Sequence, residues 1–285
     1  MNRPCFLASF DVEDWFHAEN VKVCLGTPDW DALEGRVERN THELLDVLAG
    51  LEAHATFFVL GWVARRYPAL VRRIATEGHE VASHTDMHHR LNLLPRRELA
   101  ADLARARDSL EQVTGERVLG VRAPNFSIDD GVIECMAEAG YWYDSSFFSV
   151  RAHRRYGRLS ADVDPEAPVA PVGAGLLELP LSRVRTAGTA LPWAGGAYFR
   201  LIPYPVFRLG VARRLRARSW FMFYLHPWEL DAEEVPPSDM RAALRLRAYV
   251  GRKRMRTDLS RLLAEFGSQR IDHTLRAMGY TPPAP

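Results

Sequence analysis

The sequence feature that most constrains the fold is a regular alternation of apolar, strand-like runs with segments of helical periodicity. The segments with apolar residues at helical spacing cover residues 36–54, 67–78, 94–115 and 128–140. Continuously apolar strands that alternate with helices through short connections are typical of a parallel sheet covered by helices. We therefore predict an α/β chain, and the number of units favours a single-domain barrel. The strand-like runs are residues 5–12, 55–61, 79–84, 118–124, 141–146, 176–182 and 221–230.

Length and composition limit the classes of function. A chain of 285 residues is long enough to bury one large core. Its formal net charge of +1 argues against a dedicated nucleic-acid binder. The sequence contains no apolar run of about 18 residues, so we expect no membrane span. The start of the sequence lacks the pattern of a signal peptide, and we therefore expect a location in the cytoplasm or peripheral to the inner membrane.

Titratable side chains stand where the apolar runs end, which is where an α/β barrel builds its site. Each of them alone has a trivial explanation, but a charged or titratable group at five strand ends predicts a functional site at one rim. They are Asp11, Glu13 and Asp14 after the first run, His84 and His88 after the third, Arg122 after the fourth, Asp144 after the fifth, and His226 and Glu229 in the last.

His84 and His88 predict a metal site. Because they are four residues apart, they would face the same way on a helical turn and could share one ion. A carboxylate from the end of the first run would complete the ligand set and leave positions for water or substrate. Two histidines and a carboxylate suit zinc or another divalent transition metal; cobalt, nickel, iron and manganese are the alternatives.

Five segments of the sequence, "SFDVED", "ATFFVLG…GHEVASHTDMHH", "VRAPNF", "YDSSFF" and "FYLHP", resemble in order the motifs of polysaccharide deacetylases. This is the NodB-homology family, also called carbohydrate esterase family four. The resemblance covers residues 5–230, and the later segment "GGAYFRLIPY…HPWELD" is similar to the subgroup found with exopolysaccharide and exosortase gene clusters. It implies a distorted (β/α) barrel, one divalent metal, and removal of N-acetyl groups from an amino-sugar polymer or its precursor.

The resemblance assigns roles to four residues. Asp11 matches the catalytic base, and Arg122 matches the arginine that orients this base. His226 matches the general acid, and Asp144 matches the carboxylate that holds this histidine. On this reading residues 1–285 form a single catalytic domain, with a core at about 5–230 and a helical C-terminal extension at about 231–275.

For the metal, the resemblance implies His84 and His88 as ligands but leaves the carboxylate open. The family usually has two adjacent aspartates in its first motif, whereas here Val12 follows Asp11. Strand alternation places Glu13 on the same side as Asp11, and Asp14 could reach the site only where the strand has already turned. Both Glu13 and Asp14 therefore remain candidates.

Three further residues are candidates for substrate contacts. Asn125 stands where the family often has tyrosine, and its backbone N–H could bind the oxyanion of the tetrahedral intermediate. Trp228 and Tyr198 could stack on sugar rings, although ordinary aromatic packing is the simpler explanation for each.

The sequence leaves two other functions open: a cyclic imide or ureide hydrolase of the same fold, and a catalytically silent sugar-binding module. The expected partner is an N-acetylated saccharide, which in the cell could be a lipid-linked or nucleotide-linked precursor. An arginine-rich segment near the C-terminus is either a solvated helix face or a contact for an anionic polymer or the inner membrane surface. The oligomeric state is not predicted.

Overall fold

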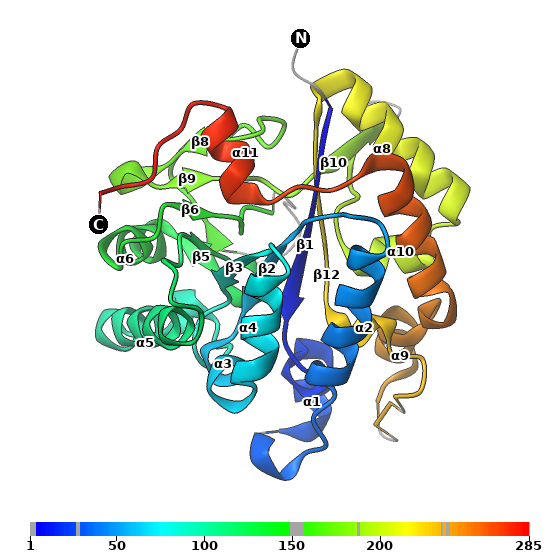
Figure 1. Ribbon diagram of the computed structural model, residues 1–285, viewed down its shortest axis with the longest axis horizontal. Helices are drawn as coiled ribbons and strands as arrows, with labels where there is room; N and C mark the ends of the chain where they lie inside the picture. The colour runs from blue at the N-terminus through cyan, green and yellow to red at the C-terminus, as the bar shows by residue number, and fades with distance from the viewer. Residues whose placement is uncertain are drawn as a thin grey trace.

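The computed structural model describes residues 4–26, 29–148, 157–186, 189–234, 236–237 and 240–284. Its centre is one eight-stranded sheet in the order β12-β1-β2-β3-β4-β6-β9-β8 (Figure 1). Neighbouring strands are parallel, except that β8 is antiparallel to β9. The sheet strands are β1 (Cys5–Val12), β2 (Thr56–Val59), β3 (Glu80–Ser83), β4 (Gly120–Val121), β6 (Tyr143–Asp144), β8 (Ala170–Pro171), β9 (Leu177–Glu178) and β12 (Trp220–Leu225).

Helices lie around the outside of the curled sheet (Figure 1). The α-helices are α1 (Glu19–Leu25), α2 (Val37–Ala49), α3 (Gly61–Arg66), α4 (Pro68–Thr76), α5 (Arg96–Thr114), α6 (Asp130–Glu138), α7 (Gly196–Leu201), α8 (Tyr204–Arg218), α9 (Ala242–Tyr249), α10 (Arg252–Phe266) and α11 (Ile271–Ala277). Two small pairings, β5 (Ile128–Asp129) with β7 (Gly157–Arg158) and β10 (Arg183–Thr186) with β11 (Thr189–Pro192), lie outside the main sheet.

The sheet is a barrel that does not close. Among the described strands, β12 and β8 are its two edges. The predicted α/β domain with a distorted barrel is therefore confirmed, in the form of a half-barrel. Its strands come from both ends of the chain, because β1 pairs with β2 on one side and with β12 on the other.

Local sequence signals explain several helix ends. Pro68 occupies the first turn of α4, where its missing N–H costs nothing. Helix α5 ends at Gly115, whose φ of 72° is the left-handed conformation that glycine adopts without strain. Asp129 caps α6 by accepting a hydrogen bond from the N–H of Val132.

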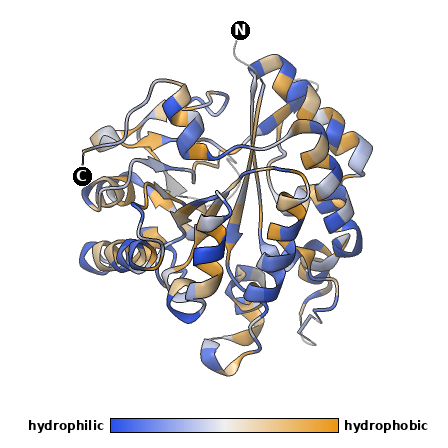
Figure 2. Cartoon of the chain, in the orientation of Figure 1, coloured by the Kyte–Doolittle hydropathy of each residue, from blue (hydrophilic) through white to orange (hydrophobic). Residues whose placement is uncertain are grey.

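The core lies on both faces of the sheet, as the apolar strands predict. In Figure 2 the strands are largely hydrophobic, whereas the outward surfaces of the helices are hydrophilic. Phe57, Phe58, Phe221 and Phe223 on the central strands are all fully buried. This rigid sheet fixes the positions of the side chains at its carboxyl edge.

The arginine-rich C-terminal segment is only partly a solvated face. Arg245 and Arg247 on α9 are exposed, but Arg252 is buried, with its guanidinium 3.9 Å from the ring centre of Tyr249 and 5.0 Å from that of Trp228. Within the described ranges, no helix combines the length and the apolar character that crossing a bilayer would require. Contact of the exposed arginines with a membrane surface stays a prediction.

Candidate active site

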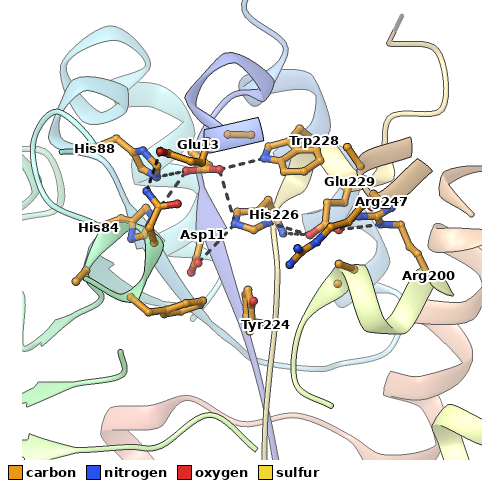
Figure 3. A pocket seen from close by; sticks show the side chains of 18 residues that line it. Asp11, Glu13, His84, His88, Arg200, Tyr224, His226, Trp228, Glu229 and Arg247 are labelled. Atoms are coloured by element: carbon orange, nitrogen blue, oxygen red, sulfur yellow. Dashed lines mark hydrogen bonds and ion pairs between the residues drawn. The ribbon is translucent and has the colours of Figure 1, made fainter. Parts of the chain in front are cut away.

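A cavity opens at the carboxyl ends of β1, β3, β4 and β12 (Figure 3). Because parallel strands end at the same edge of a sheet, side chains far apart in sequence meet there. The cavity brings together most of the predicted site residues. Its lining includes Asp11, Glu13, His84, His88, Asn125, His226 and Trp228, and in addition Glu229, Arg200 and Arg247.

Asp11 and Arg122 form a buried ion pair beneath the cavity. Oδ1 of Asp11 lies 2.7 Å from Nη1 of Arg122, and both side chains are almost inaccessible to solvent. Arg122 also donates to Oγ of Ser9, and its Nε and Nη2 donate to the carbonyl and hydroxyl oxygens of Ser145. Each of the three guanidinium nitrogens thus donates a hydrogen bond, and this fixes Oδ1 of Asp11. The other oxygen, Oδ2, faces His226 and lies 3.9 Å from its Nε2.

Glu13, His84 and His88 converge on one point. One ligand atom from each lies within 4.8 Å of the others, and all three side chains are buried. Oε2 of Glu13 is 2.5 Å from Nε2 of His88 and 3.8 Å from Nε2 of His84. Oε2 is buried, and apart from these two imidazole nitrogens it has no hydrogen-bond partner in the part of the chain that the structure describes. A buried carboxylate oxygen whose neighbours are two imidazole nitrogens fits a divalent cation.

The surroundings of His84 support its assignment as a metal ligand, whereas those of His88 do not add to it. Nδ1 of His84 donates to the carbonyl oxygen of Arg122 at 2.9 Å, which directs Nε2 toward Glu13 in the form that can bind a metal. Burial lowers the pKa of His84 to about 4, so its neutral form is favoured. His88 instead contacts Lys22, whose Nζ lies 3.2 Å from the His88 carbonyl oxygen and 3.3 Å from Nδ1.

The structure distinguishes the two candidate carboxylates. Asp14 is turned away from the histidines and accepts hydrogen bonds from the backbone N–H groups of Trp15, Arg36 and Val37. It caps the 3₁₀ turn η1 (Trp15–His17), which begins directly after Asp14 itself. Asp14 therefore stabilises a loop, and Glu13 is the carboxylate that faces His84 and His88.

His226 follows β12 and is held by Glu229, three residues further along the 3₁₀ turn η7 (Pro227–Leu230). Nδ1 of His226 lies 2.8 Å from Oε1 of Glu229, and Oε2 of Glu229 accepts from Nε of Arg200 at 2.8 Å. The indole of Trp228 stacks on His226, with ring centres 5.1 Å apart, and its Nε1 donates to Oε1 of Glu13. Nε2 of His226 is thereby directed toward Asp11 and Glu13 (Figure 3).

The charges around His226 favour its protonated form. Burial alone would lower its pKa, but the carboxylates of Glu13, Glu229 and Asp11 outweigh burial and raise the pKa of His226 to about 9. Burial would raise the pKa of Glu229, yet Arg200 and His226 lower it to about 2. The histidine can therefore carry a proton into the cavity on Nε2.

The expectation that Asp144 holds His226 is wrong. Asp144 lies at the end of β6, where it accepts a hydrogen bond from Oγ of Ser146, and its buried neighbour is Glu178 on β9. Burial raises the pKa values of both carboxyl groups, and the charge of Asp144 raises the pKa of Glu178 further, so this pair holds a proton within the core. The carboxylate in contact with His226 is Glu229.

The three predicted substrate contacts differ in position. Asn125 lines the cavity, and its backbone adopts the left-handed conformation, with φ of 55°. Trp228 also lines the cavity, but it is buried against His226 and Arg252. Tyr198 is packed against the core and does not belong to the described lining, so stacking on a sugar there is not supported.

Sequence reasoning missed the roles of Glu229 and Arg200. The spacing of His226 and Glu229 within "HPWE" was the available signal for the first. Arg200 gave none, because it comes from α7 and reaches Glu229 only in the folded chain. A Cβ atom on Gly196 would collide with the Glu229 carboxylate, so any other residue there would displace this carboxylate. His79 and His89 lie outside the cavity; His79 accepts from the N–H of Ala55, and His89 is exposed.

Fold and site together define the class: an α/β half-barrel with a two-histidine, one-carboxylate site beside a buried acid–base pair. Sequence comparison agrees with this. The family described as polysaccharide deacetylase matches residues 29–143, and a domain of unknown function (DUF3473) matches residues 145–276. Residues 29–143 of the chain are therefore similar to the polysaccharide deacetylase family.

Individual relatives match shorter parts of the chain. A chitooligosaccharide deacetylase of Sinorhizobium fredii is 40% identical over 101 residues, which are 35% of this chain and 47% of the relative. A peptidoglycan-N-acetylglucosamine deacetylase of Bacillus cereus is 32% identical over 127 residues, 45% of this chain and 57% of the relative. The chain thus spans about half the length of these curated relatives.

A solved structure extends the likeness in fold to the whole chain. A Mycobacterium smegmatis protein, provisionally described as a polysaccharide deacetylase, superimposes with a TM-score of 0.63 at 22% identity. The match covers 100% of this chain and 94% of that protein. The fold described here therefore includes the segment after residue 143.

Proposed function

We propose that the protein is a metal-dependent amide hydrolase that removes N-acetyl groups from an amino-sugar saccharide in exopolysaccharide or envelope glycan biosynthesis. The observation that carries the proposal is the convergence, in one cavity, of the Glu13–His84–His88 cluster, the Asp11–Arg122 pair and the His226–Glu229 pair. The names of the curated relatives, which refer to chitooligosaccharide and to peptidoglycan, support N-acetylated saccharides as the substrate class.

Glu13, His84 and His88 would hold the metal, and we propose zinc because two imidazoles and one carboxylate suit it. When bound there, such an ion polarises the acetyl carbonyl and lowers the pKa of a water molecule toward neutrality. The remaining chemistry falls to the side chains of the protein, since an amide needs a base to create the nucleophile and an acid to release the amine.

Asp11 is the proposed base. Its Oδ1 is fixed by Arg122, so Oδ2 is the oxygen that can take a proton from the attacking water. Arg122 holds this carboxylate in place through its buried ion pair. We propose that the backbone N–H of Asn125 stabilises the negative oxygen of the tetrahedral intermediate.

His226 is the proposed acid. Nδ1–H of His226 donates a hydrogen bond to Glu229. The proton on Nε2 therefore points into the cavity and can pass to the departing amine. Trp228 restricts the imidazole from its face, which leaves His226 in one orientation. Acid and base then act from neighbouring positions, with Nε2 of His226 3.9 Å from Oδ2 of Asp11.

The decisive experiment measures acetate release from N-acetylglucosamine oligomers by metal-stripped protein, with and without added zinc. Asp11→Asn and His84→Ala test base and ligand, and His89→Ala is the matched control because His89 is exposed and outside the cavity. We expect zinc-dependent acetate release by the wild type and by His89→Ala, and none by the other two variants. Cobalt, nickel, iron and manganese in parallel identify the metal.

Two outcomes would contradict the proposal. Failure of the wild type to bind any of these metals would contradict the proposed mechanism. Stoichiometric metal binding without acetate release, together with turnover of a cyclic imide, would show that the substrate is a cyclic amide. Neither requires a change in the fold or in the positions of the site residues.

A further inference from the structure

Arg247 is a cationic side chain on the cavity wall that has no acidic partner among the described residues. It belongs to α9 in the C-terminal segment, lines the cavity and is exposed. The other two arginines at the site are buried and paired, Arg122 with Asp11 and Arg200 with Glu229. Figure 3 shows Arg247 beside Arg200 and Glu229 at the same side of the cavity.

The main chain at Arg247 is fixed relative to the site. Its carbonyl oxygen accepts a hydrogen bond from Nη1 of Arg200 at 3.0 Å, and the same nitrogen donates to the carbonyl oxygen of Val250. Arg200 in turn is bonded to Glu229, which holds His226. The end of α9 is therefore anchored to the proposed acid, while the guanidinium of Arg247 remains available to a ligand.

The carboxylates that line the cavity already have partners. Asp11 is paired with Arg122, Glu229 with Arg200, and Glu13 faces the two histidines of the metal cluster. The fourth, Glu19 on α1, accepts a hydrogen bond from Nδ2 of Asn125 at 3.4 Å. An unpaired guanidinium presents a planar set of donors that matches a carboxylate or phosphate group. A ligand in the cavity can therefore supply the anion that the protein does not.

The position of Arg247 also indicates which part of the substrate carries the anion. The metal cluster would receive the acetyl oxygen, and His226 would protonate the amine that stays on the sugar. Arg247 lies on the side of Glu229 and Arg200, away from His84 and His88 (Figure 3). It consequently faces the sugar rather than the acetyl group.

We propose that Arg247 binds an anionic group, a carboxylate or a phosphate, on the sugar that is deacetylated or on its neighbour, so that the preferred substrate is an acidic saccharide. This inference rests on the proposed function, since it names the substrate class of that site. It also gives the exposed guanidinium of α9 a function within the cavity that is distinct from binding a membrane surface.

The test compares Arg247→Gln with Arg245→Gln, a matched control on the same helix that is exposed and outside the cavity lining. The substitution at 247 removes the guanidinium but keeps the carbonyl group that Arg200 contacts. The zinc-loaded enzymes would act on N-acetylchitotetraose as the neutral substrate, on a hyaluronan tetrasaccharide as the carboxylate substrate, and on UDP-N-acetylglucosamine as the phosphate substrate.

We expect the wild type and Arg245→Gln to prefer one of the acidic substrates, by kcat/KM, over the neutral one. Arg247→Gln should lower this acidic-to-neutral ratio about tenfold, which is the effect of losing one charge-assisted contact. Raising the salt concentration should weaken the preference in the wild type and have less effect in Arg247→Gln. The two acidic substrates distinguish a sugar carboxylate from a phosphate.

An equal ratio in the wild type and in Arg247→Gln would overturn the inference and leave the deacetylase standing. If no substrate released acetate, the proposed function would fail, and calorimetric binding of the same three saccharides would still decide the role of Arg247. Tighter binding of an acidic saccharide that Arg247→Gln abolishes supports the inference. Equal binding by both proteins refutes it.

Discussion

Nδ1 of His226 and Oε1 of Glu229 lie 2.8 Å apart within one 3₁₀ turn, so the histidine and the carboxylate that orients it come from the same short loop. The loop is braced from outside by Arg200, which contacts Glu229 and the end of α9. The C-terminal segment thus supports the proposed acid, although it lies beyond the residues that match the deacetylase family.

Glu229→Gln should lower kcat for acetate release from an N-acetylated sugar by about 100-fold, because the acid loses its orientation and part of its charge support. Hydrolysis of 4-nitrophenyl acetate should fall much less, since nitrophenolate leaves without a proton. Acetate and nitrophenolate assays on the same zinc-loaded protein measure both effects.

Asp144→Asn is the control for this prediction, because Asp144 is buried beside Glu178 and does not contact His226. Asp144→Asn should change the thermal stability, but any loss of rate should be the same for the N-acetylated sugar and for 4-nitrophenyl acetate. A larger selective loss in Asp144→Asn than in Glu229→Gln would show that the loop carboxylate is not the partner of the acid.

The identity of the metal-binding carboxylate gives a second prediction. Glu13→Gln should weaken zinc binding at least 100-fold, because it removes a charged ligand atom from the cluster. Asp14→Asn should keep the metal and lose stability by about 1 kcal/mol or more, because an amide nitrogen cannot accept the backbone N–H bonds that Asp14 receives. Metal content by mass spectrometry and thermal denaturation separate the two, and metal loss confined to Asp14→Asn would reverse the assignment.

The sequence predicted those parts of the fold and site that depend on regular patterns. The alternation of strands and helices places Asp11, His84 and His226 at one edge of the sheet, since all parallel strands end there. Pro68 marks the start of α4 and Gly115 the end of α5, as predicted, because the effect of each residue on the backbone is local.

Contacts made by irregular segments could not be predicted in this way. The choice between Glu13 and Asp14 depends on where β1 gives way to η1, and the sequence pattern does not fix that residue. Asp144 ends a strand at the correct edge, but its side chain turns toward Ser146 and Glu178. Arg200 reaches Glu229 only because α7 packs against β12.

Arg122 provides a third prediction. Its guanidinium is fully buried and donates to Asp11, Ser9 and Ser145. Lysine keeps the charge but cannot span these partners, so Arg122→Lys should cost about 3 kcal/mol of stability and most of the activity. The exposed Arg96, which pairs with Glu134 and Glu138 at the surface, gives the control Arg96→Lys, for which we expect little change in the melting temperature. Equal melting temperatures for the two variants would contradict this role.

Glu80 lies at the opposite end of β3 from His84 and provides a prediction about pH. Its Oε1 accepts from the hydroxyl of Tyr143, and its Oε2 accepts from Oγ1 of Thr56 and from the backbone N–H of Asp272 at the start of α11. Burial, and after it the nearby charge of Asp272, raises the pKa of Glu80 to about 8. The C-terminal helix is thus held to the sheet by a carboxyl group that prefers to be neutral.

Because the folded state holds a proton that the unfolded chain releases near the ordinary value of 4.5, the stability from this group is complete below that pH and is lost as the pH rises through about 8. Glu80→Gln mimics the protonated form and should flatten the decline. We expect the melting temperature of the wild type to fall by about 3 °C more than that of Glu80→Gln between pH 6 and pH 8.5. Calorimetry on both metal-loaded proteins measures this, with the exposed Glu134→Gln as control. Parallel declines in all three proteins would mean that Glu80 is ionised in the folded state and that its contacts with Tyr143 and Asp272 stabilise the charged form.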